Sequence, residues 1–129
     1  LLSALVAHGK GSGLNYAKHF SNDPHSRESC LGLFITGAVY YGHDGKSLHL
    51  KGLEHRFNDN ASRRGIVIHG APYVSKQFAH TNHRLGRSWG YFAVSEHTIK
   101  RIIPLIKNHS LLFAYYPSEN WLNHSQFLK

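Results

Sequence analysis

The sequence contains a single cysteine, Cys30, so no disulfide can form within the chain and cysteine usage does not identify the redox compartment. It also lacks any apolar stretch long enough to cross a bilayer. The opening segment Leu1–Ala7 has neither the basic leader nor the length of a signal peptide, and we expect it to form a strand. No membrane span is therefore predicted.

Acidic residues are scarce. Seven Asp and Glu face fifteen Lys and Arg, which gives a formal net charge of +8, and the twelve histidines add positive charge at mildly acidic pH. This balance indicates a polyanionic neighbour. The basic residues are scattered, however, and form no run longer than the pairs Arg63-Arg64 and Lys100-Arg101, so no nucleic acid partner is predicted.

A chain of 129 residues with 41% hydrophobic residues is long enough for one globular domain with one core, and residues 1–129 are taken as a single domain. β-Branched and aromatic residues predict strands, and the turn residues 42–45 predict that the first two form a hairpin. The predicted strands are 31–41, 46–53, 66–68 and 111–116. Helical spacing of isoleucines after Ser95 predicts a helix over 96–107, and a shorter helix is expected over 73–79.

This pattern favours a mostly β domain, a β-sandwich or partly open barrel with one or two peripheral helices, over a parallel βαβ layout.

A long polar loop, from His8 to about Ser29, follows the first segment. Loops of this length are often functional, and the loop is either a substrate-facing lid or a surface excursion. Pro104 is expected to kink or shorten the predicted helix, and the tail after Pro117 has no clear pattern.

Two segments carry the strongest functional signal, HGAPY at 69–73 and GRSWGYFAVS at 86–95. They resemble the signature of the YkuD-type murein L,D-transpeptidases, in which a His-Gly at a strand end precedes a Ser-x-Gly-Cys loop. Four further segments of this chain, VAHGKGSG, the Tyr-Tyr-Gly turn, FNDNA and SLLFAYYP, are similar to segments that occur in the same order in the family, so the resemblance spans residues 5 to 117. It implies a mostly β catalytic domain whose earliest strands are expected before Leu1, so residues 1–129 are expected to be an N-terminally truncated form of that domain.

The resemblance also implies a reaction and the residues that perform it. In the family, a thiolate attacks the carbonyl between diaminopimelate and the terminal D-alanine of a stem peptide, and a thioester then passes the acyl group to an amine. Carried over to this sequence, His69 is the base, residue 91 is the nucleophile, and backbone amides around Gly90 hold the oxyanion. The remaining expected site residues, which would bind substrate, are Gly70, Tyr73, Arg87, Ser88 and Trp89.

The partners implied by the resemblance are peptidoglycan stem peptides in the periplasm or cell envelope, and no cofactor is expected. Arginines flank both motifs, and they either pair with stem-peptide carboxylates or are solvated loop charges. These arginines are Arg63, Arg64, Arg84 and Arg87. The sequence leaves the oligomeric state open.

Residue 91 departs from the family pattern because it is tyrosine. A phenol ionises only near pH 10, so Tyr91 is a much poorer nucleophile than a cysteine thiol at neutral pH. Its ring is also much larger than a thiol and is expected to occupy the space that the acyl donor needs. Transpeptidation by the family mechanism is therefore not expected. The open alternatives are a degenerate member of the family, a mutant of an active cysteine enzyme, a tyrosine that stacks on ligand, and a basic module for anionic polymers.

Two other groups of residues have a functional and a structural interpretation. Cys30 is either a relocated nucleophile or, as we favour, a small buried filler before an apolar strand. His80 and His83 have a spacing that one helical turn could use, and a second candidate set consists of three histidines far apart in the sequence, His8, His69 and His97. No cysteine or carboxylate lies at a zinc-ligand interval from them, so no metal site is predicted.

Overall fold

The computed structural model describes residues 2–128, and its framework is a long hairpin. Strand β1 (Gly32–Gly42) runs antiparallel to β2 (Gly45–Gly52), with Gly42 opposite Gly45 across the turn. Gly45 has a φ of 83°, a left-handed conformation that glycine adopts without the strain of a side chain. The register shifts between Thr36 and Val39, which marks a bulge in β1. The hairpin predicted from the sequence is therefore confirmed.

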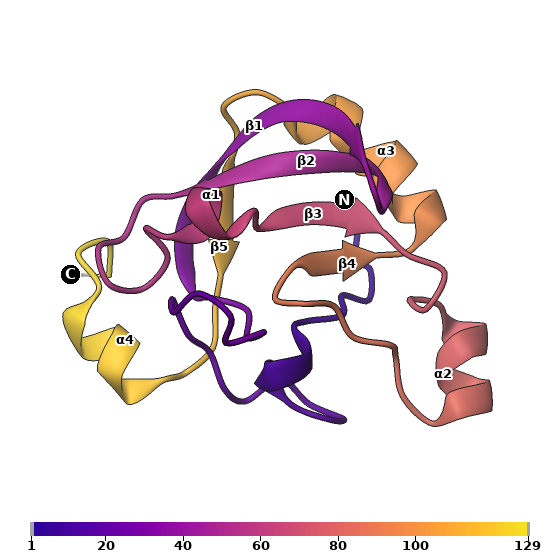
Figure 1. The fold of residues 1–129 in the computed structure, drawn as a ribbon, viewed down its shortest axis with the longest axis horizontal. Helices are drawn as coiled ribbons and strands as arrows, with labels where there is room; N and C mark the ends of the chain where they lie inside the picture. Colours follow the sequence, from indigo (N-terminus) through magenta and orange to yellow (C-terminus); the bar gives the residue numbers. More distant parts are fainter. Residues whose placement is uncertain (1, 129) are drawn as a thin grey trace.

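The hairpin lies inside a five-stranded mixed sheet with the order β4-β3-β2-β1-β5, which curls into a half-barrel (Figure 1). β3 (Val67–Gly70) is antiparallel to β2, and β5 (Leu111–Ala114) is antiparallel to β1. β4 (Phe92–Val94) is parallel to β3, and α2 (Lys76–Asn82) lies between them in the chain. The mostly β prediction is confirmed, and the β3–β4 pair is its one parallel element among the described strands.

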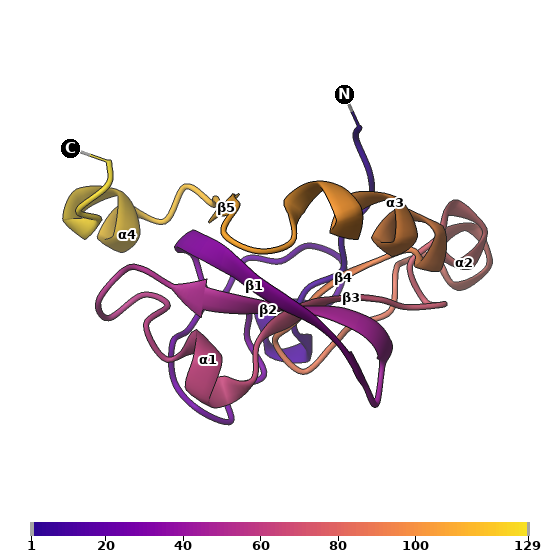
Figure 2. The same cartoon turned by 90° about the horizontal axis from the view of Figure 1, so that it is seen from above.

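Helices lie on both sides of the sheet. Figure 2 shows α3 (Glu96–Ile106) on the side of β5, and α1 (Ala61–Arg64) on the opposite side. As predicted, Ser95 caps α3, its Oγ accepting from the backbone N of Thr98 at 3.0 Å. The expected helix over 73–79 begins later, because Ser75 caps α2 in the same way. Pro104 lies inside α3, which ends two residues later, close to the expected end.

The main core fills the space between the sheet and α3. Most of its buried members come from β1, β2, β3, β4 and α3, and they include Phe34, Leu48, Ile68, Phe92 and Ile103. Cys30, Ile66 and Ala61 of α1 complete it. A smaller apolar cluster of Ala7, Ala71, Val74 and Ala93 lies where the chain leaves β3. The main core includes Ile68 of β3 and the smaller cluster includes Ala71 and Val74, so apolar packing continues from the strand into the residues that follow it.

The first segment does not form the strand predicted for it. Residues 2–6 are exposed and have no ladder partner, and Leu1 lies outside the described residues. Only Ala7 pairs, in an isolated bridge in which its N and O each bond to Ala93, at 2.8 and 3.0 Å. The long loop that follows begins with a short 3-10 helix, η1 (Lys10–Ser12). Apolar composition alone predicted the strand, but strand formation also requires a neighbouring edge.

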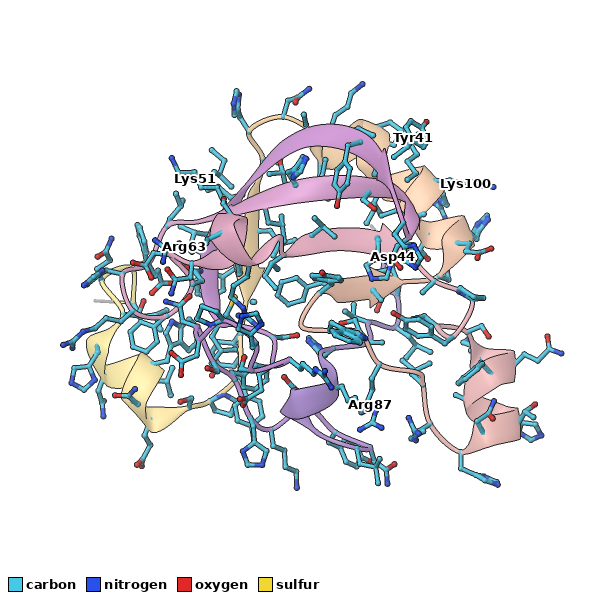
Figure 3. All side chains as sticks on the ribbon, viewed as in Figure 1. Tyr41, Asp44, Lys51, Arg63, Arg87 and Lys100 are labelled. Atoms are coloured by element: carbon cyan, nitrogen blue, oxygen red, sulfur yellow. The ribbon has the colours of Figure 1, made fainter. Side chains whose placement is uncertain are left out.

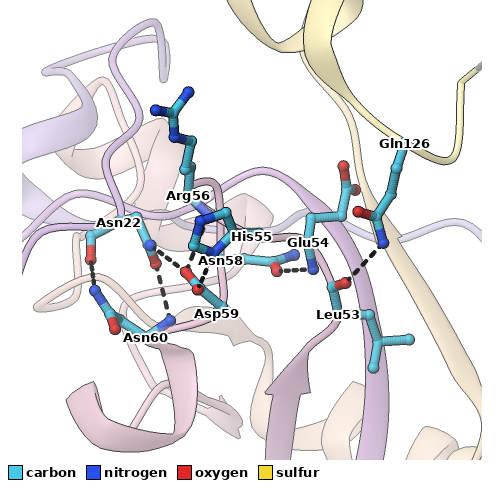
Figure 4. A network of polar contacts seen from close by, with 9 residues as sticks. All are labelled: Asn22, Leu53, Glu54, His55, Arg56, Asn58, Asp59, Asn60 and Gln126. Atoms are coloured by element: carbon cyan, nitrogen blue, oxygen red, sulfur yellow. Dashed lines mark hydrogen bonds and ion pairs between the residues drawn. The ribbon is translucent and has the colours of Figure 1, made fainter.

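The tail after residue 117 contains a helix that the sequence pattern did not predict, α4 (Glu119–His124). Its Trp121 is buried, and the indole Nε1 donates to Oε1 of Glu54 at 3.2 Å. Ser125 Oγ donates to the same oxygen at 2.5 Å, and the backbone N of Leu33 donates to Oε2 at 2.7 Å. Figure 4 shows Glu54 beside Asn58, whose Oδ1 accepts from the Glu54 backbone N at 2.8 Å. A buried carboxyl thus ties the C-terminal helix to the sheet.

Candidate active site

His69 lies on β3 between two strands, opposite Ser47 of β2 and Ala93 of β4. Its side chain is 1% exposed, and its Nδ1 is 3.1 Å from the carbonyl oxygen of Gly70. A carbonyl oxygen only accepts, so this contact assigns the ring proton to Nδ1. Nε2 then carries a lone pair, and this buried atom has no hydrogen-bond partner among the described residues. The imidazole is therefore set up to accept a proton through Nε2.

Tyr91 is the residue next to this imidazole. The two ring centroids are 5.8 Å apart and the ring planes meet at 83°, an edge-to-face contact. The tyrosine is half-buried, immediately precedes β4, and also packs against the main core. The structure thus brings together the two side chains that the sequence motifs placed in one site.

The loop before Tyr91 is held by hydroxyl groups. Ser88 is buried, and its Oγ donates to the carbonyl oxygen of Tyr91 at 2.6 Å and accepts from the backbone N of Gly90 at 3.3 Å. Ser29 Oγ donates to the Gly90 carbonyl oxygen at 3.2 Å. Ser88, expected to bind substrate, therefore shapes the loop, and the Gly90 amide expected in the oxyanion hole is engaged by it.

Gly90 has a φ of 113°, and a Cβ added there would lie 3.0 Å from the carbonyl oxygen of Glu28 and 3.0 Å from Nη2 of Arg64. Residues with a side chain rarely adopt this conformation, and the space for one is already filled. Glycine is therefore required at the turn that presents Tyr91 to His69.

Other tyrosines surround the hairpin end near the site. Tyr40 stacks on His49 with ring centroids 4.1 Å apart, and burial raises the pKa of its phenol. Ser47 opposes this rise through a hydrogen bond, while nearby Tyr91 and Asp44 add to it. Burial also raises the pKa of Tyr73, and Asp44 adds to that shift. Both phenols therefore stay neutral at physiological pH. Tyr40 belongs to the Tyr-Tyr-Gly turn of the resemblance, but it was not predicted as a site residue.

A hollow of about 680 Å³ opens beside Tyr91. It is lined by Pro24, His25, Arg27, Arg63, Arg64, Trp89 and Tyr91. The guanidinium carbon of Arg27 lies 4.2 Å from the ring centroid of Trp89, which is 64% exposed. We call this hollow the arginine groove.

A larger cavity, of about 810 Å³, lies away from His69 between the long loop and α4, and none of the predicted site residues lines it.

The other predicted site residues have different neighbours. Gly70 packs against α3, where an added Cβ would lie 2.6 Å from Cγ2 of Ile99. Tyr73 packs on Gly86, and its carbonyl oxygen accepts from the Gly86 backbone N at 2.9 Å, which closes the connection around α2. Arg87 lines a separate small cavity with residues 13–17. Figure 3 shows it well apart from Arg63 of the arginine groove.

Cys30 is fully buried in the main core. Burial raises the pKa of its thiol to about 11, against a smaller opposing effect of Arg64. Such a thiol has almost no thiolate at neutral pH and is not accessible, so the interpretation as a buried filler is the one that the structure supports.

Within residues 2–128, no three histidine, cysteine or acidic side chains come close enough together to hold a metal ion. Over the same residues, no helix has the length and apolar character needed to cross a bilayer.

Comparison with protein families assigns the chain. The family model described as an L,D-transpeptidase catalytic domain matches residues 1–115, well over half of the sequence. The chain belongs to this L,D-transpeptidase family. No curated protein and no solved structure matches it. The matched range of this L,D-transpeptidase domain includes His69, Tyr91 and every strand of the sheet, and it leaves out α4.

Proposed function

We propose that this L,D-transpeptidase domain binds peptidoglycan stem peptides in the cell envelope and does not form the family's thioester, because Tyr91 stands at the nucleophile position. The observation that carries the proposal is the contact between the rings of His69 and Tyr91, with centroids 5.8 Å apart. In the family motif the residue after Ser-x-Gly is the cysteine that the histidine deprotonates, and here that place is taken by Tyr91.

The base of the reaction is kept while its partner is changed. The Nε2 atom of His69 is buried and has no hydrogen-bond partner among the described residues, while Nδ1 contacts the Gly70 carbonyl oxygen, an arrangement suited to a base beside a nucleophile. Residue 91 offers this base a phenol in place of a thiol, and an aryl ester would be a different intermediate from a thioester. The half-buried ring also fills space next to the imidazole that an acyl donor would need.

The test combines binding and turnover, using purified sacculi and a stem tetrapeptide that ends in D-alanine. We expect the protein to be retained on sacculi and to release no D-alanine. The Tyr91→Cys variant should release D-alanine and form cross-linked product, and adding His69→Ala to it should remove that activity.

Two results would contradict the proposal. Release of D-alanine by the protein with Tyr91 intact, or acylation mapped to that side chain, would show that the site is active as it stands. Failure to bind sacculi, together with tight and salt-dependent binding to duplex DNA, would instead identify a basic module for anionic polymers.

A further inference from the structure

Three guanidinium groups converge on the arginine groove without a counter-ion. Arg27 comes from the long loop, while Arg63 and Arg64 come from α1. The only ion pair among residues 2–128 joins His55 to Asp59, so no described carboxylate neutralises these arginines. No acidic side chain lines the groove. Like charges held together without a partner repel one another, and an anion in the groove would relieve that repulsion.

The arginines differ in what they contact. The guanidinium of Arg64 donates to the carbonyl oxygens of Ser21 and Glu28, at 2.9 and 2.7 Å, and to Ser26 Oγ at 3.2 Å. Its donors are occupied in holding the loop against α1. Arg27 and Arg63 are exposed, and no acceptor is described for either guanidinium within residues 2–128. These two arginines therefore have donors available for a ligand, and Arg64 fixes the loop that carries Arg27.

The groove walls indicate what kind of anion fits. A guanidinium donates two parallel hydrogen bonds to one carboxylate, so two arginines match two carboxylates. Trp89 is exposed beside Arg27, and its ring and that of Tyr91 offer flat apolar surface for the chain that joins the carboxylates. A peptide with two or more carboxylates satisfies both the charge and the surface.

We propose that the arginine groove binds an acidic peptide, with Arg27 and Arg63 each pairing with one carboxylate and Trp89 packing on the chain between them. That the natural ligand is a stem peptide rests on the proposed function. That the groove binds acidic peptides rests only on its arginines and aromatic rings. The groove reaches Tyr91, so a peptide bound there lies next to the site of His69.

The test measures binding of the tripeptide Glu-Glu-Glu, followed by tryptophan fluorescence. Of the two tryptophans, Trp89 lines the groove and Trp121 is buried away from it, so a change on binding reports on Trp89. The Arg27→Gln/Arg63→Gln variant removes the two free guanidiniums, and Lys100→Gln/Arg101→Gln on α3 is the matched control, because it removes two exposed positive charges elsewhere. We expect the first variant to weaken binding by about tenfold or more and the control by less than about twofold. The tripeptide Gln-Gln-Gln should not bind.

Equal weakening in both variants would overturn the inference, because it would mean that net charge alone attracts the peptide. Inorganic phosphate binding as tightly as Glu-Glu-Glu would also overturn it, since the groove would then select an oxyanion and not a peptide. Both arginines are exposed and Arg64 is kept, so the variant should fold as the parent does, which circular dichroism checks.

Sacculi separate this inference from the proposed function. If Glu-Glu-Glu binds through the two arginines but sacculi are not retained, the proposed function fails and the groove chemistry stands. If sacculi are retained equally by the Arg27→Gln/Arg63→Gln variant, the proposed function stands and the groove is not its peptide site.

Discussion

Tyr91→Cys puts a thiol beside the His69 imidazole, and the same chain contains a reference thiol in Cys30. Because burial raises the pKa of Cys30 to about 11, its thiolate fraction at pH 8 is about 0.1%. A thiol with the ordinary pKa of about 8.5 is roughly one quarter ionised at that pH, so ionisation alone favours residue 91 by roughly 200-fold. The lone pair on Nε2 of His69 should increase this difference further.

The assay is the rate of alkylation by iodoacetamide at pH 8, with the modified residue located by mass spectrometry. The parent protein should stay unmodified until denaturant exposes Cys30, and the Tyr91→Cys variant should take up one equivalent at residue 91. Adding His69→Ala should slow this reaction several-fold at pH 7 and change it little at pH 9.5, where the thiol ionises without a base.

The reasoning is refuted if the thiol at residue 91 reacts no faster than Cys30 in the folded protein. It is also refuted if His69→Ala leaves the rate unchanged at pH 7, because the imidazole would then have no influence on the residue that its ring contacts.

Three further changes test the framework. Glu54→Ala leaves three donors, including the Trp121 indole, without an acceptor. Unfolding in urea should show a free energy of unfolding lower by about 3–5 kcal/mol. A loss below about 1 kcal/mol would mean that the hydrogen bonds to Glu54 do not stabilise the fold. Burial lowers the pKa of His8 below its ordinary 6.5, so the imidazole binds a proton less readily in the folded state than in the unfolded state, and the free energy of unfolding should fall as the pH drops below about 6.5. In a His8→Phe variant the free energy of unfolding should depend less on pH, and an unchanged pH profile would contradict this. Gly90→Ala forces a side chain into a φ of 113° and should cost about 1–3 kcal/mol in thermal denaturation, whereas no shift in Tm would show that the turn can relax.

The parts of the fold that the sequence predicted depend on neighbours in the chain. The hairpin follows from its turn and its β-branched strands, and α3 follows from the Ser95 cap and the spacing of its isoleucines. The strand β4 was not predicted, because its three residues form a strand only through pairing with β3 and Ala7. The helix α4 was missed because it is held by Glu54, far back in the sequence.

The candidate site divides in the same way. The pairing of His69 with residue 91 was predicted from two motifs whose spacing reflects a shared fold. Arg27 was not predicted, because only the folded loop brings it to Trp89. Ser88 was expected to bind substrate, but the structure buries its hydroxyl in bonds to its own loop. Motifs identify which residues matter, whereas the direction of each side chain depends on long-range packing.

The carboxyl of Glu54 also determines where this domain can be cut. The family match stops at residue 115, yet Trp121 and Ser125 supply two of the three donors to a side chain that is 1% exposed. A fragment that ended with the match would lose these two hydrogen bonds and the buried Trp121 ring, and we expect this to lower the free energy of unfolding by roughly 2–6 kcal/mol. We therefore expect a stable fold to need residues beyond the end of the family match, and expression boundaries should include Trp121 and Ser125.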